Sequence, residues 1–585
     1  MARPCAKTLL GLAALLLFGA ASAQATAPAD ERGFRAHVAA LVSEGELTFE
    51  EGLVVRFQRV FDPAGLPPAL RGAAVPNRSA TLLIHEYKRL QGTLSPAAVD
   101  QIDSYLTPRT AAFRYGTVHF DLAYDTQGAD AVPADDFAPA NGVPDFVERV
   151  GEYLETSWTV LFDQTGFRAP GVPAGGYPVS FRGMGAYGYT EEQDGATHIV
   201  LHRSFQGFPA NSDPDGAVLG AAKVTAAHEL KHASQFASSG WTEQGWLEAD
   251  ATWAEDFVFD ETDDYLRFLT AGSPVSAPES WLPNGAASYE DCLWQRSLSE
   301  AHGPLVLVDF FSRRAAVPGE TVTAAFDAVL RQRGSSLAEA ALRLGVWSHF
   351  CGANARLRPI GFEEAESYPT PPVGAFLDHD SAALSRTVST LGTTFILVDT
   401  NEREGQPWVQ FLGNRSLPFA VSAVATDVNG VRRILSIDLD PDRVSSSEVP
   451  VNWNDLSFLT LVVTSLNGSV PSSGYYLSVD DQAPTGVEPT HTVGFQLLPN
   501  RPNPFRGATT IGFSLAADGP VRLAVYDVRG RMVRRLVQGE VLTAGPHERV
   551  WNGVDEAGRP AAPGVYYVRL DAAQSGATNK MLLLR

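Results

Sequence analysis

The stretch Ala226-Ala227-His228-Glu229-Leu230-Lys231-His232 carries an H-E-x-x-H pattern inside a region, about 217–312, whose apolar spacing is mainly helical. On a helix, residues i and i+4 lie on one face. His228 and His232 can therefore present their imidazoles to a single Zn²⁺. Glu229 would lie beside that metal, where it could take a proton from a water molecule. The stretch predicts a metal-binding helix; the alternative is an amphipathic helix with two solvent-facing histidines.

A catalytic zinc site takes three protein ligands and keeps one position open. The metzincin extension of the motif fails, because Gln235 stands where its glycine belongs and Ser238 where its third histidine belongs. The segment Trp246–Asp256 is the next predicted helix, and Glu248 lies on it 16 positions after His232. Glu248 is therefore a candidate for the third ligand.

Four further side chains are candidates for roles around this metal. Glu243, in the turn before Glu248, is an alternative ligand whose direction the turn does not fix. Glu255 lies two turns after Glu248 on the same face and is a second competing ligand; we expect it to hydrogen-bond to a ligand histidine, and a solvent-facing residue is the equal alternative. Tyr289 is the candidate donor to the oxyanion that develops in peptide hydrolysis, and His302 is the alternative. A purely structural role is the competing interpretation of both.

Residues 1–23 have the pattern of a signal peptide. Arg3 and Lys7 precede a short apolar run over 9–20, and Ala21-Ser22-Ala23 offers a small-residue cleavage site. The run is too short to span a bilayer stably, and no other stretch approaches a transmembrane helix. We therefore expect an exported protein, either secreted or at the cell surface.

Composition excludes some classes of partner. The chain has 585 residues, with 45 Lys and Arg against 67 Asp and Glu, a formal charge of −22. An acidic surface repels phosphate backbones, which argues against a nucleic-acid partner. An oxidising compartment would permit a disulfide between Cys292 and Cys351, and two buried free thiols are the equal alternative.

The first half of the chain divides into two predicted parts. Residues 24–110 form a helical N-terminal region with a Thr-x-x-Glu capping box at 48–51, either a propeptide or an ordinary subdomain. Residues 111–367 form the catalytic domain, in which 118–124 alternate as a half-buried strand. Residues 197–202 are a second strand, expected at the sheet edge, where an extended peptide could pair with it, or else inside the sheet.

A loop before a helix that begins near Asp145 has EF-hand-like spacing. Asn141, Asp145 and Glu148 are its candidate Ca²⁺ ligands. Phe137 and Pro139 occupy two positions where oxygen ligands belong. The loss of those two ligands favours a plain turn and helix cap over a calcium site.

The second half of the chain is β-rich. It follows a Pro-rich linker at 368–372. Short apolar strands at close intervals over 385–480 predict a β-sandwich. A second linker, 481–492, precedes a separate module at 494–585, in which residues 521–526 alternate as a half-buried strand.

Residues 115–310 resemble a group of secreted bacterial metallopeptidases. The shared features are H-E-x-x-H-x-x-Q-F at 228–236, Trp-Ala-Glu-Asp at 253–256 and, upstream, Asn-Gly-Val-Pro-Asp at 141–145. The resemblance implies a gluzincin-like zinc peptidase with Glu248 as the carboxylate ligand.

Residues 494–585 resemble the FlgD-type immunoglobulin-like domain found at the C-termini of secreted bacterial proteins. Similar tails serve as type IX sorting signals in some bacteria, which implies a partner in the secretion machinery or at the cell surface. The segments that carry the resemblance are Pro502–Phe505, Val525–Asp527, Gly530-Arg531, Trp551–Gly553 and Pro563–Tyr567.

Together these features predict a multidomain α+β chain: a zincin-like metallopeptidase domain followed by two β-sandwich, immunoglobulin-like modules. The expected activity is zinc-dependent hydrolysis of a protein or peptide substrate, with Zn²⁺ as cofactor and Ca²⁺ as a weaker addition. Two alternatives stay open. One is a non-catalytic surface or adhesion protein with a peptidase-like domain, and the other is a zinc hydrolase acting on a non-peptide bond.

Overall fold

The computed structural model describes residues 31–584 with gaps at 72–75, 108–109, 280–287, 357, 379–383, 414–417, 438, 440–443, 467–471, 482–495, 498–499, 501–502, 504, 516–517, 528, 544 and 573–574. The predicted signal peptide, nearly all of the 481–492 linker, Pro502 and Pro504 lie outside the described residues. No helix within the described ranges has the length and apolar character of a membrane span. The chain divides into two compact units, one holding the described residues up to Gly151 with Pro173–Ala210, the other Glu152–Val172 with the residues from Asn211 on.

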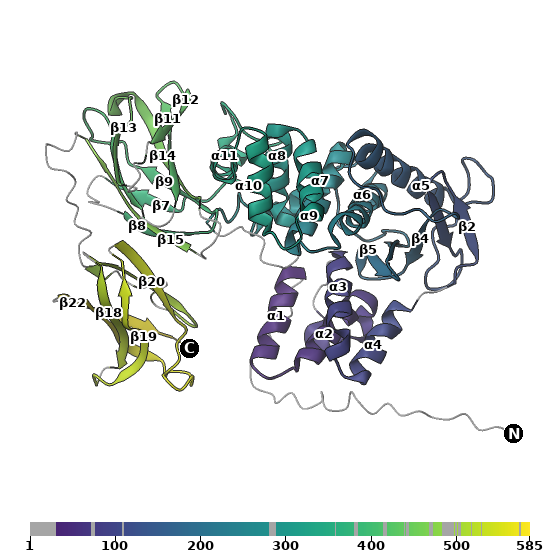
Figure 1. The fold of residues 1–585 in the computed structure, drawn as a ribbon, viewed down its shortest axis with the longest axis horizontal. Helices are drawn as coiled ribbons and strands as arrows, with labels where there is room; N and C mark the ends of the chain where they lie inside the picture. The colour runs from purple at the N-terminus through teal and green to yellow at the C-terminus, as the bar shows by residue number, and fades with distance from the viewer. Residues whose placement is uncertain are drawn as a thin grey trace. The chain divides into compact units, whose positions relative to one another are not determined.

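The first unit is built on a six-stranded mixed sheet with strand order β1-β5-β6-β4-β3-β2 (Figure 1). β5 and β2 run antiparallel to their inner neighbours, and the remaining pairs are parallel. The strands are β1 (Asn77–Ser79), β2 (Phe113–Gly116), β3 (Phe120–Tyr124), β4 (Tyr177–Arg182), β5 (Ala186–Gln193) and β6 (Ala196–His202). Its helices are α1 (Glu31–Ser43), α2 (Phe49–Phe61), α3 (Thr81–Leu90) and α4 (Pro96–Leu106), and α5 (Asp145–Trp158) begins in this unit.

The N-terminal helices share their core with this sheet. Phe57 of α2 and Tyr87 of α3 pack in one apolar cluster with Tyr189 of β5 and Val200 of β6. The three-residue strand β1 pairs in parallel with β5 at the edge of the sheet. The predicted division at residue 110 is therefore not a break in the fold, because a segment of the N-terminal region completes the sheet.

Three local predictions for this unit meet different outcomes. The capping box is confirmed, since the Thr48 hydroxyl accepts from the Glu51 amide and the Glu51 carboxylate accepts from the Thr48 amide. The half-buried strand begins at Phe120, and Val118 before it is 84% exposed. The expectation that 197–202 lies at a sheet edge is wrong, because β6 is paired on both sides, by β5 and by β4.

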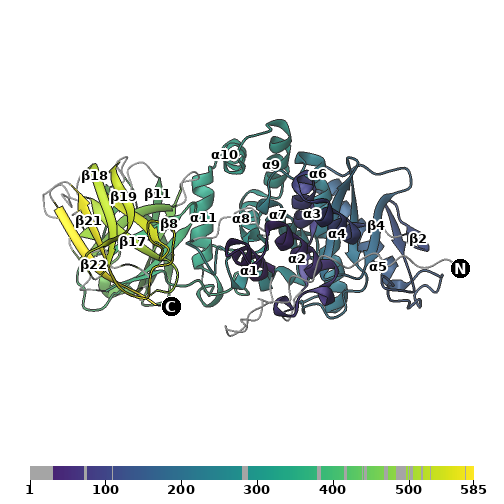
Figure 2. The same cartoon turned by 90° about the horizontal axis from the view of Figure 1, so that it is seen from below.

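The second unit begins with a group of helices, as the apolar spacing of 217–312 predicts. They are α6 (Ala217–Ser239), α7 (Gly245–Val258), α8 (Leu293–His302), α9 (Leu305–Ala316), α10 (Val322–Gln332) and α11 (Leu337–His349). Nearly every residue of α6 from Gly220 to Gln235 is buried, because α7 and α9 both pack against it (Figure 2). Cys292 and Cys351 are buried free thiols, which is one of the two predicted alternatives, and they form no disulfide. Burial raises the pKa of both thiols.

Two β-sandwich modules follow. The first places the sheet β13-β10-β15-β8 against the sheet β12-β11-β14-β9-β7, over a common apolar core. Its strands are β7 (Ala375–Leu377), β8 (Leu384–Ser389), β9 (Thr393–Val398), β10 (Trp408–Gly413), β11 (Phe419–Asp427), β12 (Arg432–Ile437), β13 (Val444–Glu448), β14 (Leu456–Ser465) and β15 (Ser472–Asp480). Because β7 belongs to this module, the sandwich begins about ten residues before the predicted start at 385.

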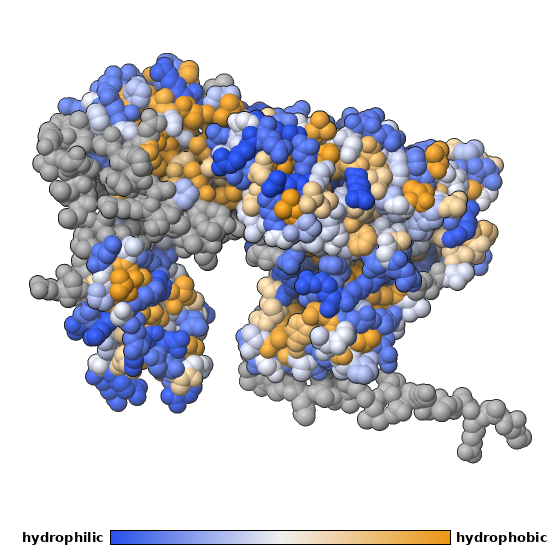
Figure 3. All heavy atoms as spheres, in the orientation of Figure 1, coloured by the Kyte–Doolittle hydropathy of each residue, from blue (hydrophilic) through white to orange (hydrophobic). Residues whose placement is uncertain are grey.

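The second module pairs the sheet β16-β17-β20 with the sheet β19-β18-β21-β22. Its strands are β16 (Gln496–Leu497), β17 (Thr509–Leu515), β18 (Gly519–Asp527), β19 (Met532–Leu542), β20 (Gly545–Trp551), β21 (Gly564–Ala572) and β22 (Ser575–Leu583). Val521, Leu523 and Val525 are buried, as the alternation of 521–526 predicts. Hydrophilic residues predominate on the face of this module that Figure 3 shows, which fits a fold with its apolar residues turned inward.

Candidate metal centre

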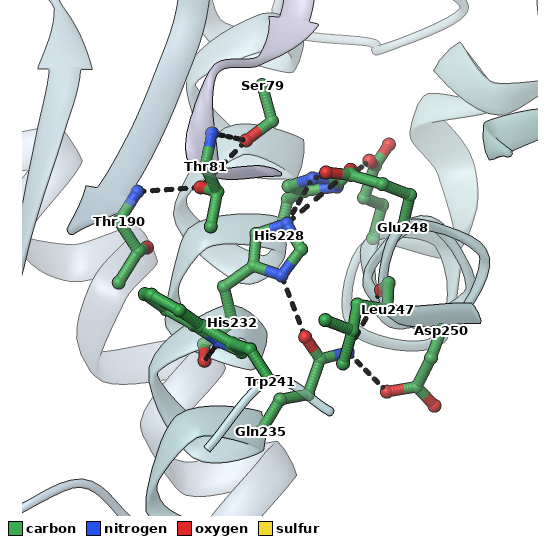
Figure 4. A network of polar contacts seen from close by, with 11 residues as sticks. Ser79, Thr81, Thr190, His228, His232, Gln235, Trp241, Leu247, Glu248 and Asp250 are labelled. Carbon is green, nitrogen blue, oxygen red and sulfur yellow. Dashed lines mark hydrogen bonds and ion pairs between the residues drawn. The ribbon is translucent and has the colours of Figure 1, made fainter. Parts of the chain in front are cut away.

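Three ligand atoms from α6 and α7 converge on one point (Figure 4). The Nε2 atom of His228 lies 3.1 Å from the Nε2 atom of His232 and 3.1 Å from Oε2 of Glu248. The Nε2 atom of His232 lies 3.5 Å from the same carboxylate oxygen. All three side chains are at most 1% exposed. The structure thus brings together the two histidines of the motif and the carboxylate expected as third ligand.

The outer nitrogen of each histidine has a partner that fixes its tautomer. Nδ1 of His228 lies 2.6 Å from Oε1 of Glu255, and Nδ1 of His232 lies 2.7 Å from Oε1 of Gln235. The Gln235 amide is fixed in turn, since its Nε2 donates to the Leu247 carbonyl at 2.9 Å and to Asp250 at 2.8 Å. Both Nδ1 atoms must then carry the proton, because each faces an acceptor.

In the neutral form of each imidazole, this tautomer leaves a lone pair on Nε2. Together with the Glu248 carboxylate, the two Nε2 atoms then form three electron-pair donors at mutual distances of 3.1 to 3.5 Å. Three such donors repel one another unless a cation lies among them. Two imidazoles and one carboxylate are a donor set that suits Zn²⁺ and leaves a position open. The residues present therefore fit the metal that the sequence predicts.

The electrostatics of the cluster also favour a positive charge at this point. Burial alone would lower the pKa of His228, but hydrogen bonds to Glu248 and Glu255 outweigh it and raise the pKa to about 9. Burial alone would raise the pKa of Glu248, but the His232 imidazole and hydrogen bonds from both histidines lower it to about 2. A carboxylate held ionised in the interior requires a cationic partner.

The candidate catalytic groups lie beside these ligands in different ways. Glu229 is fully buried on α6, directly after the first histidine. Tyr289 begins a short 3₁₀ turn, Tyr289–Cys292, and its ring centroid lies 6.1 Å from that of His228. The structure therefore places Tyr289 near the metal ligands, while its role as an oxyanion donor stays a prediction.

The alternative candidates are engaged elsewhere. Glu243 pairs with the Arg314 guanidinium at 2.8 Å and accepts from the hydroxyls of Ser239 and Thr242. These contacts use both of its carboxylate oxygens, so Glu243 is not a ligand in this arrangement. His302 ends α8, and its Nε2 lies 2.8 Å from a guanidinium nitrogen of Arg343. Burial lowers the pKa of His302, and the nearby arginine lowers it further.

A tight loop of five residues joins the two ligand helices. Gly240, Trp241 and Gln244 all have positive φ, with values of 67°, 59° and 49°. Only glycine adopts such a conformation without cost, so Trp241 and Gln244 are strained. The Trp241 indole donates to the main-chain carbonyl of His232 at 2.8 Å, which ties the loop back to the ligand helix.

A second set of buried polar residues, which the motif analysis does not assign, supports His232. Lys231, inside the motif itself, is completely buried and pairs with Asp250 at 2.6 Å. Its ammonium group also lies 3.8 Å and 4.3 Å from the ring centroids of Phe167 and Phe311. The H-E-x-x-H motif does not mark this set, because Lys231 occupies one of its two unspecified positions and Gln235 and Asp250 lie outside it.

The predicted calcium loop is held together by its own hydrogen bonds. Asp145 accepts from the main-chain amides of Phe137 and Ala138, and the Asn141 amide group donates to Glu148 at 2.9 Å. Within the described part of the chain, no three His, Cys, Asp or Glu ligand atoms gather here. These contacts give the loop the form of a turn and helix cap, the interpretation that the sequence favours, and calcium binding at Asn141, Asp145 and Glu148 stays a weaker prediction.

Comparison with known proteins assigns only the C-terminal module. Residues 501–576 match the FlgD Ig-like domain family, which confirms the predicted C-terminal domain. No curated protein sequence matches the chain. Solved structures with partial similarity include PorZ from Porphyromonas gingivalis, described as a bacterial surface component of the type IX secretion system, at 15% identity over 28% of this chain and 22% of that chain, with a TM-score of 0.13.

Two further structures show similarity of the same extent. The β-1,2-glucanase from Parabacteroides distasonis is 12% identical over 35% of this chain and 32% of its own, with a TM-score of 0.15. Latent PorU from P. gingivalis is 13% identical over 34% of this chain and 20% of its own, with a TM-score of 0.14. The chain spans less than a third of the length of each of the three. Likenesses at these TM-scores carry no conclusion about fold or activity.

Proposed function

We propose that the protein is an exported zinc-dependent peptidase with a zincin-like, gluzincin-type site. The observation that carries this proposal is the convergence of His228 Nε2, His232 Nε2 and Glu248 Oε2 within 3.5 Å of one another in a buried place. Those three residues would hold the metal. Glu255 and Gln235 would keep the two imidazoles in the tautomer that binds it.

The chemistry follows from the residues around the ligands. Bound zinc would supply a Lewis acid that polarises a carbonyl and makes water more acidic. Glu229 would take the proton of the attacking water as its oxygen bonds to the substrate carbonyl carbon, and then deliver that proton to the leaving amine. Tyr289 would donate a hydrogen bond to the oxyanion that forms on the former carbonyl oxygen. Burial of all these groups strengthens each electrostatic interaction by lowering the local dielectric.

Location and partners form the second part of the proposal. The signal-peptide pattern of residues 1–23 supports export, and the FlgD Ig-like domain supports a role for the tail in sorting or surface attachment. A protein or peptide is the proposed substrate, since the predicted family acts on peptide bonds. The C-terminal domain is proposed to contact the secretion machinery or cell surface and to take no part in cleavage.

Metal analysis combined with a peptide-library cleavage assay tests the proposal. We expect about one zinc per purified chain, cleavage of part of the library, loss of cleavage on chelation and recovery on adding zinc back. Protein that holds zinc but cleaves no peptide would favour the non-catalytic alternative. Protein that binds no zinc would overturn the proposal.

A further inference from the structure

We infer that Gln235, Asp250 and Lys231 form a positioning network for His232, in which the buried Lys231–Asp250 pair orients the Gln235 amide. None of the three is proposed to contact a substrate or the metal. The inference rests on the proposed zinc site and concerns how strongly that site holds its metal.

The first step of the argument is the direction of the Gln235 amide. An amide side chain can present either its oxygen or its NH₂ group to a neighbour. Here the NH₂ group has two acceptors, the Leu247 carbonyl at 2.9 Å and Asp250 Oδ2 at 2.8 Å. The oxygen must therefore face Nδ1 of His232, 2.7 Å away. This direction keeps the proton on Nδ1 and the lone pair of Nε2 pointed at the ligand cluster.

The second step is the charge of Asp250. Asp250 is 2% exposed, and an ionised carboxylate in such a place is costly unless it is paired. Lys231 supplies the pairing charge at 2.6 Å, and it is itself completely buried. The rings of Phe167 and Phe311 flank the ammonium group and add cation–π attraction. Asp250 Oδ2 therefore lies against two nitrogen groups, the Lys231 ammonium and the NH₂ group of Gln235, and this placement fixes the direction of the amide.

The third step is the difference between the two histidines. His228 is held by an anionic acceptor, Glu255, whereas His232 is held by the neutral Gln235. A neutral amide has no intrinsic preference for presenting its oxygen, so it needs outside groups to fix it. The Lys231–Asp250 pair supplies what the charge of Glu255 supplies directly at the other ligand.

The network also joins the two ligand helices. Lys231 and Gln235 lie on α6, and Asp250 lies on α7, two positions after the ligand Glu248. A contact that fixes the rotamer of His232 therefore also fixes the axial position of α7 against α6. Partners of metal ligands that act in this way typically change metal affinity by about 10–100-fold when they are removed.

Three variants of the full-length protein test the inference by zinc affinity, measured by competition with a chelator, and by the visible spectrum of the Co²⁺-substituted protein. Gln235→Leu should weaken zinc binding by about 10–100-fold and change the Co²⁺ spectrum. The double variant Lys231→Met/Asp250→Leu removes the ion pair as a pair, which keeps the cost in stability small. It should still weaken zinc binding, because only the Leu247 carbonyl then holds the amide.

The third variant is a rescue. In Gln235→Glu/Asp250→Asn, the new asparagine can donate to the new glutamate, and the glutamate can accept from His232. Its zinc affinity should lie closer to wild type than that of Gln235→Leu. Gln58→Leu, the same change at a buried glutamine of α2 in the other unit, is the matched control and should leave zinc affinity unchanged.

The outcomes separate this inference from the proposed function. Wild-type zinc affinity in both Gln235→Leu and the Lys231→Met/Asp250→Leu variant would overturn the positioning network. A purely structural role would lower the melting temperature of the metal-free protein without changing the zinc affinity or the Co²⁺ spectrum of the folded fraction. If Gln235→Leu fails to fold, the two double variants decide. Wild-type protein that binds no zinc would overturn the proposed function instead.

Discussion

The α6–α7 helix pair and the C-terminal module bury opposite kinds of residue. The helix pair buries nine ionisable or amide side chains: His228, Glu229, Lys231, His232, Gln235, Glu248, Asp250, Glu255 and Asp256. The core cluster of the module consists of aliphatic and aromatic residues, among them Phe513, Val525, Trp551 and Leu570. Burying charge costs free energy that a fold alone does not require. The comparison separates a helix pair that buries charge, as the proposed metal site requires, from a module whose core needs none.

The largest effect should come from Glu229→Gln in the helix pair. The change removes the proposed general base and leaves all three zinc ligands in place. Peptide cleavage should fall by roughly 10²–10⁴-fold with zinc content unchanged. Turnover per bound zinc is the measurement, and Glu152→Gln on the exposed side of α5 is the control. Cleavage at the wild-type rate would contradict the assignment of Glu229 as the general base.

Breaking the buried ion pair next to the site tests the cost of interior charge. Arg314→Met leaves the 2%-exposed Glu243 without its guanidinium and should destabilise the second unit by about 3–5 kcal/mol. The double variant Arg314→Met/Glu243→Leu should recover much of that loss, because neither charge is then stranded. Urea unfolding followed by intrinsic fluorescence measures both. A double variant as unstable as the single one would contradict this account.

An equally large change in the module should act by a different route. Trp551→Ala removes a fully buried side chain that lies between Phe505 and Tyr566, with ring centroids 5.6 Å and 5.0 Å away. The cavity should cost the module about 3–5 kcal/mol. Zinc content and peptide cleavage should stay at wild-type levels, since the module is proposed to take no part in the chemistry. Limited proteolysis of the full chain checks the first expectation. Loss of cleavage in the variant would make the module part of the active site.

A smaller effect is expected from a buried histidine that belongs to neither region. Nδ1 of His202 accepts from the amides of Ser204 and Phe205, and burial together with Arg203 lowers its pKa to about 4. The folded state therefore holds His202 neutral, while the unfolded chain takes up a proton below about pH 6.5. Neutral His202 therefore contributes to the free energy of unfolding above that pH, and the contribution is lost as the pH falls towards 4. The loss between pH 7 and pH 5 is about 2 kcal/mol.

The variant His202→Asn tests whether His202 causes this loss of stability at lower pH. Asparagine can accept the same two amides through its Oδ1 atom but does not titrate. The stability of the variant should depend less on pH between 7 and 5 than that of the wild-type protein, as measured by urea unfolding at both pH values. An unchanged slope would assign the acid sensitivity to other groups.

The sequence predicts the ligands of the candidate site better than it predicts the residues that position those ligands. His228 and His232 follow from helical spacing and the chemistry of zinc, which are local properties, whereas Glu248 follows from the resemblance to gluzincin sites. The function of Gln235 cannot be read in the same way, because its direction depends on an acceptor from the next helix. A lysine inside a motif is normally read as solvent-exposed, and only the packing of two aromatic rings shows Lys231 to be buried.

The same distinction holds for the fold. The alternation at 521–526 predicts a strand, because the C-terminal module has one buried face per sheet. β1 was missed since its three residues, Asn-Arg-Ser, have no apolar alternation and are ordered by pairing with β5. The prediction that β6 lies at a sheet edge was wrong for a related reason. A local pattern predicts that a strand exists, whereas strands distant in sequence determine its neighbours.

The strained loop between α6 and α7 has a consequence for how this chain can vary. The five loop residues already turn the chain with three positive φ values, so one inserted or deleted residue between Ser239 and Gly245 would shift or rotate α7 against α6. Glu248 and Glu255 would then leave the histidines together. Substitutions in the loop are tolerable where φ allows them, whereas changes of length are not. Natural chains that keep this metal cluster should therefore vary at exposed loop positions such as Thr242 but conserve the length of 16 positions from His232 to Glu248.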